Sequence, residues 1–209
     1  MSRQHGETTT MKTLYIFLTR SGTLLSNLVY RLTGAQYTHI SLAFDEDLST
    51  LYSSTRKNGY TMFPAGPSRE YLNRGVFLMR ENIPCALYAL EVTDEAYIRA
   101  KRRTQHMMHH GELYRFNSLG LLLCWMHIRW QRRRHYFCSQ FVSEVLQKSG
   151  ALDLPKPSTL MHPSDYAELP QLRCLYRRQS MEMGEVESVM GLYLSVLLGA
   201  VRGGVRHLF

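Results

Sequence analysis

Residues Tyr136–Leu146 read YFCSQFVSEVL, and this stretch decides the fold around it. Its apolar residues recur at the helical spacing of three and four: Phe141, Val142, Val145 and Leu146. Cys138 precedes Phe141 by three positions and Val142 by four, so its thiol points to the same, inward side. We therefore predict a core helix that begins at Cys138 and ends near Gly150, a residue suited to a helix C-terminus.

Cys138 and His39 form the most informative pair in the chain. A cysteine at the start of a helix is stabilised as thiolate by the helix dipole, and a histidine can act as its base. His39 lies in the predicted strand 37–44, where it alternates with large apolar residues. Either residue alone also fits a structural role, as a buried thiol or a satisfied strand histidine. His135 and His162 are alternative partners for the thiol.

The turn at 45–48 predicts a hairpin between strands 37–44 and 51–55. If Phe44 pairs with Ser49, counting back places Ser54 opposite His39. A polar residue there fixes the imidazole tautomer. A slip of one residue replaces Ser54 with Ser53 or Thr55.

The net charge of +8 is concentrated in one window. Residues 99–134 hold nine Lys or Arg and one acid, Glu112, whereas the rest of the chain holds sixteen of each sign. Such a window suits an anionic partner or a membrane surface, or else a solvated helix face. Aromatic residues in the window follow apolar spacing, which favours core packing over nucleic-acid binding.

The other patterns predict further elements and no cofactor. Strands are expected at 14–18, 76–79 and 86–92, helices at 21–32, 93–108 and 118–128, a loop at 58–74 and a basic connector at 129–134. We find no P-loop and no dinucleotide fingerprint, and the histidines at 106, 109 and 110 fit a solvated helix better than a metal site. The four cysteines lack C-x-x-C spacing. Residues 1–10 lack a secretory signal, so a cytoplasmic location is expected.

Three segments follow from these patterns. Residues 1–10 form a mobile tail, 11–178 a single domain, and 179–209 an extension with an amphipathic helix at 186–201. Small residues recur at intervals of four on the other face of this helix. We expect it to dock on the domain or on a second copy, or to contact a membrane peripherally.

Several motifs together resemble the circularly permuted NlpC/P60-type, papain-like cysteine hydrolases, a bacterial group. The segments 38–43 and 51–54 are similar to their histidine hairpin, and 136–142 to their nucleophile helix. Tyr114–Asn117, Gly150, Lys156–Pro157 and His162–Asp165 fit the middle and tail of the group. The resemblance covers residues 14–175.

The resemblance implies an α+β fold in which a small antiparallel sheet packs against the helix of Cys138. It implies Cys138 as nucleophile and His39 as base. In this group the third catalytic residue is often a carboxylate, amide or histidine, whereas this hairpin offers only Ser53, Ser54 and Thr55, of which Ser54 is the candidate opposite His39. The oxyanion would be bound by the Cys138 N–H and a side chain, Tyr37 or Tyr136. The expected activity is hydrolysis or acyl transfer on a peptide, amide or thioester. The alternative is a binding or scaffold protein with a degraded site on the same fold.

Overall fold

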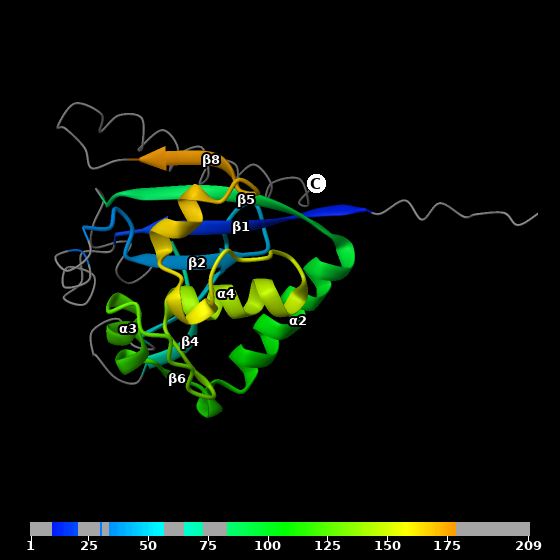
Figure 1. Cartoon of the computed structure of the whole chain (residues 1–209). Coiled ribbons are helices and arrows are strands. Elements are labelled where there is room, and N and C mark those ends of the chain that lie inside the picture. Colours follow the sequence, from blue (N-terminus) through cyan, green and yellow to red (C-terminus); the bar gives the residue numbers. More distant parts are fainter. Residues whose placement is uncertain (1–9, 21–29, 31–33, 57–64, 73–82, 179–209) are drawn as a thin grey trace, which may run out of the picture.

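The computed structural model describes residues 10–20, 30, 34–56, 65–72 and 83–178, and within them the chain forms an α+β fold (Figure 1). The strands are β1 Met11–Thr19, β2 His39–Ala43, β3 Leu51–Arg56, β4 Ala65–Glu70, β5 Cys85–Thr93, β6 Arg115–Phe116, β7 His135–Tyr136 and β8 Arg173–Arg178. The α-helices are α2 Asp94–His109, α3 Ser118–Trp125 and α4 Cys138–Ser149. Short 3-10 helices occupy Gly111–Leu113, Ser158–Leu160 and Pro163–Glu168. No helix within these ranges has the length and apolarity to cross a bilayer.

An antiparallel sheet with the strand order β4-β3-β2-β1-β5-β8 forms one layer. The central strand β1 pairs with β5 along its whole length, from Met11 opposite Thr93 to Thr19 opposite Cys85. On its other side β1 pairs with β2, where Thr19 lies opposite His39. The two-residue strands β6 and β7 pair in parallel, apart from the large sheet.

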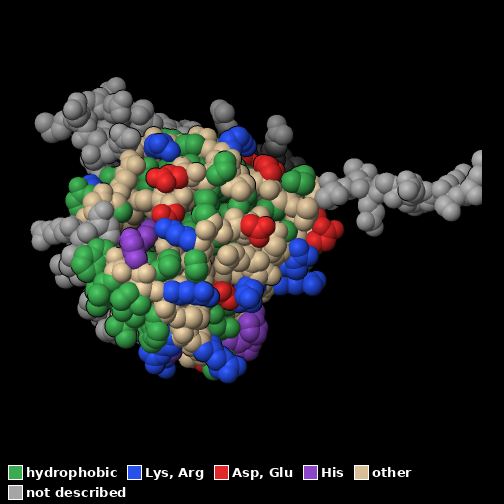
Figure 2. Space-filling model, in the orientation of Figure 1, with side chains coloured by type: hydrophobic (Ala, Val, Ile, Leu, Met, Phe, Trp, Pro, Cys, Tyr) green, Lys and Arg blue, Asp and Glu red, His purple; other side chains and the backbone are tan. Residues whose placement is uncertain are grey.

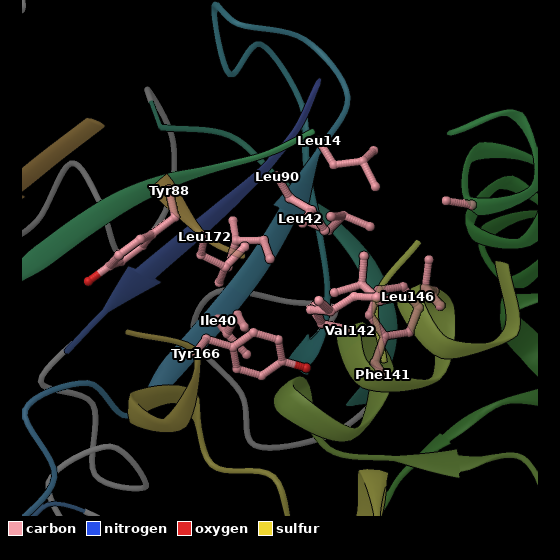
Figure 3. Packing of buried hydrophobic residues seen from close by; sticks show 14 of the residues in the cluster. Leu14, Ile40, Leu42, Tyr88, Leu90, Phe141, Val142, Leu146, Tyr166 and Leu172 are labelled. Atoms are coloured by element: carbon pink, nitrogen blue, oxygen red, sulfur yellow. The ribbon is translucent and has the colours of Figure 1, made fainter. Parts of the chain in front are cut away.

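Helix α4 packs its apolar side against the sheet (Figure 3). Phe141, Val142 and Leu146 are fully buried and share one core cluster with Ile40 and Leu42 of β2. Burial of such a side chain contributes about 1.5–3 kcal/mol, so the helical spacing of these residues fixes which side of α4 faces the sheet. The helix that carries Cys138 is therefore fixed against the strand that carries His39.

Helix α2 packs against both α4 and the sheet, and it holds the C-terminal half of α4. Arg103 on α2 forms an ion pair with Glu144, with Nη2 and Oε1 2.7 Å apart. Arg99 Nε donates to the carbonyl oxygen of Ser149 at 2.7 Å, where α4 ends. Gly150 follows with a φ of 71°, the left-handed conformation in which glycine pays no steric penalty.

Most of the elements predicted from apolar spacing are present. Strands β1, β2, β3 and β5 lie where the sequence predicts strands, and α4 runs from Cys138 to its Gly150 cap. Helix α2 begins after Thr93, whose Oγ1 accepts the N–H of Ala96 at 3.3 Å. Of the expected helix 21–32 the structure describes Tyr30 alone. The expected helix at 186–201 and the strand at 76–79 lie outside the described residues, as does the expected tail apart from Thr10.

Two predictions about secondary structure are wrong, and one strand was missed. Residues 65–70 form strand β4 inside the predicted loop 58–74; Pro67 is tolerated there because β4 is an edge strand. Strand β8 was not predicted, because its sequence RCLYRR lacks a clear apolar alternation. The segment 118–128 was expected to be a core helix, but α3 ends at Trp125 and exposes several large apolar side chains.

Candidate active site

Cys138 is the first residue of α4. Phe137 before it has an extended backbone and makes no side-chain cap to the helix. The first N–H groups of a helix lack intrahelical acceptors and form the positive end of its dipole. Cys138 is nearly buried, with 8% of its surface exposed. The thiol therefore lies at a place that favours a negative charge and is largely shielded from water.

Hydrogen bonds from neighbouring elements fix this helix start. The hydroxyl of Ser54 on β3 donates to the carbonyl oxygen of Tyr136 at 2.6 Å. On the other side of Cys138, the hydroxyl of Ser139 donates to the carbonyl oxygen of Met161 at 2.6 Å. Both hydroxyls are buried, so they hold the backbone on either side of the thiol in one position.

The structure brings His39 to Cys138. His39 is the first residue of β2, and a side-chain hydrogen bond with Cys138 is among the causes that raise its pKa. These two residues lie 99 positions apart in the sequence. The juxtaposition predicted from the sequence is therefore present in the fold.

Glu70 lies on the other side of the imidazole. His39 Nε2 is 3.0 Å from both Oε1 and Oε2 of Glu70, the last residue of β4. The hydroxyl of Ser41 donates to Glu70 Oε2 at 2.6 Å and lies 3.3 Å from His39 Nε2. The side chains of His39 and Glu70 are 13% and 15% exposed. A thiol, an imidazole and a carboxylate thus form a chain of contacts that is largely shielded from solvent.

The charges of His39 and Glu70 stabilise each other. Burial alone would lower the pKa of His39, but the carboxylate of Glu70 and the thiol of Cys138 raise it from 6.5 to about 10. Burial alone would raise the pKa of Glu70, but the charge of His39 and the hydrogen bonds from His39 and Ser41 hold it below its usual value. At neutral pH the pair therefore consists of an imidazolium and a carboxylate.

Ser54 does not orient the imidazole of His39, so the prediction of Ser54 as the third catalytic residue is wrong. The hairpin pairs Leu42 with Tyr52, one residue away from the predicted register. A slip of one residue turns a side chain to the opposite face of the sheet. Ser54 consequently bonds to the carbonyl oxygen of Tyr136, and Ser53 bonds to that of Ile40 at 2.7 Å.

The two tyrosines predicted to bind an oxyanion have other neighbours. Burial raises the pKa of Tyr37, and the charged groups that affect it most are Tyr88 and Arg177. Burial also raises the pKa of Tyr136, with Glu144 adding to the shift and Arg103 opposing it. The phenol oxygen of Tyr37 is buried without a hydrogen-bond partner in the described part of the chain, and the role of either tyrosine at the oxyanion stays a prediction. The other donor predicted to bind the oxyanion is the backbone N–H of Cys138, which lies at the start of α4.

Sequence reasoning missed Glu70 because it missed β4. The residues Gly66, Pro67 and Ser68 are typical of a loop, and a carboxylate in a loop has no defined partner. Residues 65–70 read AGPSRE and show no alternation of apolar and polar side chains, so no local signal indicates a strand there. In the structure β4 pairs with β3 from Ala65 opposite Arg56 to Glu70 opposite Leu51.

The other histidines considered as partners lie elsewhere. His135 Nδ1 lies 2.9 Å from the carbonyl oxygen of Arg133. His162 Nε2 lies 3.6 Å from the Sγ of a different cysteine, Cys124. The fold therefore contains a second thiol–imidazole contact, between α3 and the segment before the last 3-10 helix.

A groove of about 650 Å³ lies on a different part of the molecule. It is lined by Pro67, Ser68, Arg69, Gln105, Met108 and His109. It is adjacent to Glu70 along β4, but neither Cys138 nor His39 lines it. Within the described ranges, no three or more His, Cys, Asp or Glu side chains are grouped to hold a metal ion.

No protein-family model, curated protein or solved structure matches this chain. The site is therefore interpreted from its own residues and geometry.

Proposed function

We propose that the protein is a papain-like cysteine hydrolase or acyltransferase that acts on a peptide, amide or thioester. The observation that carries this proposal is the contact chain from Cys138 through His39 to Glu70. A nucleophile, a base and a third group that orients the base recur in enzymes that form acyl intermediates. The α+β architecture, with the thiol at a helix start and the histidine on an adjacent strand, supports the same reading.

His39 accepts and returns the proton in this proposal. Because Nε2 faces the carboxylate of Glu70, Nδ1 is left to exchange a proton with Cys138. Because the raised pKa keeps His39 protonated at neutral pH, the site rests with the thiol proton already on Nδ1, as a thiolate beside an imidazolium. Both the helix dipole and the imidazolium stabilise the thiolate. Glu70 acts through His39 as a positioning residue.

The reaction then proceeds through an acyl-enzyme. The Cys138 thiolate attacks the substrate carbonyl, a carbon–sulfur bond forms, and the negative charge moves to the carbonyl oxygen. Backbone N–H groups at the start of α4 are placed to stabilise this oxyanion. His39 gives its proton to the leaving amine or thiol as that bond breaks. Water or an amine then attacks the thioester and its proton passes to His39. The carbon–sulfur bond breaks, the product leaves, and the thiolate–imidazolium pair is restored.

The alternative function is a binding or scaffold protein with a degraded site. Three features of the sequence support it: the lack of a carboxylate on the hairpin beside His39, the basic window 99–134 and the amphipathic pattern at 186–201. Glu70 provides a carboxylate from the next strand, which favours the enzyme.

The test is cysteine labelling with iodoacetamide at pH 5 to 9, followed by peptide mass spectrometry. An ordinary thiol has a pKa of about 8.5 and is almost fully protonated at pH 6. We expect Cys138 to react much faster than Cys85, Cys124 and Cys174 at pH 6, and His39→Ala to remove that advantage. Labelling of Cys138 at the rate of the other thiols would contradict the proposal.

Intact-mass measurement after incubation with activated acyl esters and thioesters tests the acyl-enzyme directly. We expect a single acyl adduct that maps to Cys138 and decays in water. His39→Ala should slow both formation and decay of the adduct, because the base takes part in both steps.

A further inference from the structure

Five large apolar side chains are exposed side by side on α3 and the turn after it. They define a surface that we call the α3 patch: Leu119, Leu122, Trp125, Met126 and Ile128. Each is between 39% and 53% exposed. In Figure 2 an apolar cluster lies over the position that α3 occupies in Figure 1, in the lower left of the view.

The spacing along the helix explains why these residues gather on one side. Leu119, Leu122 and Met126 are separated by three and four positions, so they lie along one face of the helix. The opposite face carries Gly120 and Cys124, which are buried against the protein. Burial of large apolar side chains is favourable, and a contiguous exposed cluster of them marks an interaction site.

The body of the protein holds α3 firmly in this orientation. Asn117 caps the helix through Oδ1, which accepts the N–H of Gly120 at 3.0 Å. Its Nδ2 donates to Gln140 Oε1 on α4 at 3.1 Å. A Cβ on Gly120 would lie 2.1 Å from Asn117 Nδ2, so a side chain at this position would displace the cap. These hydrogen bonds therefore fix the orientation of the helix that carries the α3 patch.

Positive charge borders the α3 patch. The exposed arginines Arg129, Arg132, Arg133 and Arg134 follow it directly, and residues 118–134 contain no acidic residue. Across the described part of the chain, no ion pair joins a carboxylate to any of these four arginines. A binding partner must therefore accept apolar side chains at its surface and supply negative charge close to them.

We propose that the α3 patch docks the protein onto the surface of an anionic phospholipid bilayer. Leucine, isoleucine, methionine and tryptophan side chains insert at the boundary between headgroups and acyl chains, where tryptophan is favoured. Arginines at the same level bind lipid phosphates and anionic headgroups. A symmetric contact with a second copy fits less well, because it would place the arginine cluster of one copy against that of the other.

Tryptophan fluorescence gives a selective readout, because both tryptophans of the chain, Trp125 and Trp130, lie in this segment. The full-length protein is titrated with vesicles of phosphatidylcholine alone or with 30% phosphatidylserine (roughly the anionic content that attracts basic segments). We expect a blue shift with the anionic vesicles, and quenching by lipids with a doxyl group near the headgroup. Binding should weaken in 0.5 M NaCl (about 4 Å Debye length).

Variants with matched controls connect the binding to the α3 patch. Leu122→Glu with Met126→Glu should reduce vesicle affinity by about tenfold or more, and Arg132→Glu with Arg133→Glu by about fivefold per arginine. The controls alter the exposed Ile98 and Arg102 on α2: Ile98→Glu and Arg102→Glu should bind almost as the unchanged protein does. Circular dichroism melting confirms that each variant is folded.

Three outcomes would overturn the proposal. The first is no binding to anionic vesicles. The second is binding that the α3 variants leave unchanged, which would assign it to another segment such as 179–209. The third is a dimer in sedimentation velocity that Leu122→Glu dissociates, without vesicle binding by the unchanged protein. Cysteine labelling of the same variants separates this proposal from the catalytic one, because the substituted residues are not part of the proposed chain of Cys138, His39 and Glu70.

Discussion

Cys138 and Cys124 both contact an imidazole, but they lie at opposite ends of their helices. Cys138 is the first residue of α4, where the helix dipole favours a negative charge. Cys124 is the next-to-last residue of α3, where the dipole opposes one. Burial raises the pKa of the Cys124 thiol to about 12, so this thiol stays protonated at neutral pH.

The surroundings of the two imidazoles shift their pKa values in opposite directions. A carboxylate reaches the ring of His39, and the pKa of that ring rises to about 10. Burial lowers the pKa of His162, although Asp165 opposes the shift. Asp165 Oδ2 instead accepts the backbone N–H of His162 at 2.6 Å and lies 2.7 Å from Lys156 Nζ. Contact between a thiol and an imidazole therefore does not suffice; the position on the helix and the partner of the imidazole decide its chemistry.

The largest expected effect comes from exchanging the two cysteines for alanine in turn. Cys138→Ala should abolish both acyl-adduct formation and turnover, because no other group supplies the nucleophile. Cys124→Ala is the matched control and should retain both, although the lost buried thiol makes the fold somewhat less stable. Intact mass after acyl-ester treatment checks both variants. Adduct formation in Cys138→Ala would instead indicate Cys124 as the nucleophile and His162 as its base.

Removing the charge of Glu70 should make the first pair resemble the second. In Glu70→Gln the pKa of His39, followed by NMR, should fall from about 10 toward or below its ordinary 6.5. Labelling of Cys138 at pH 6 should slow by about 100-fold, within the range of acid–base effects.

The control for Glu70→Gln is Asp165→Asn, which alters the carboxylate near the second pair. It should leave the pKa of His39 and the labelling of Cys138 unchanged. If His39 kept a high pKa in Glu70→Gln, the carboxylate of Glu70 would not be the group that stabilises the imidazolium.

The ion pair should also appear in the pH dependence of stability. The pKa of His39 is higher in the folded state than its ordinary 6.5, so its contribution is complete below about pH 6.5 and is lost as pH rises through 10. The pKa of Glu70 is lowered by folding, so its contribution is present above its ordinary 4.5 and is lost in acid. Urea unfolding should show the greatest difference between unchanged protein and Glu70→Gln at pH 5 to 6. An equal difference at pH 10.5 would contradict the charged pair.

The smallest effect is expected from Ser41→Ala. This change removes the 2.6 Å hydrogen bond to Glu70 Oε2 but leaves both contacts between Glu70 and His39 Nε2. A hydrogen bond to a charged group contributes about 1.5–3 kcal/mol, and only part of this should reach the thiol. We expect labelling of Cys138 to slow by less than about tenfold. Ser53→Ala is the control, since the Ser53 hydroxyl bonds to a backbone carbonyl; an equal loss in both would indicate general loosening of the sheet.

The sequence predicts the Cys138 side of the site well, because apolar spacing and a C-terminal glycine define α4 locally. It also predicts that His39 lies on a strand. It does not predict Glu70, because an edge strand tolerates Pro67 and Gly66 and therefore reads as a loop. It misjudges Ser54 because a one-residue change in register turns a side chain to the other face.

The exposure of α3 is missed for a different reason. Residues 121–123 are all leucine, and a segment that is apolar on every side gives no information about which side faces the core. Burial and docking on a surface require the same residue types. Only the packing of Gly120 and Cys124 against the body shows which side is left exposed.

The place of β4 at the edge of the sheet has a consequence for biosynthesis. The carboxylate belongs to a strand that is held on one side by β3, and Cys138 leaves the ribosome after both of its partners. In the proposed mechanism the activation of Cys138 requires both His39 and Glu70, so a copy in which β4 has not yet paired, or has locally opened, would carry an unactivated thiol.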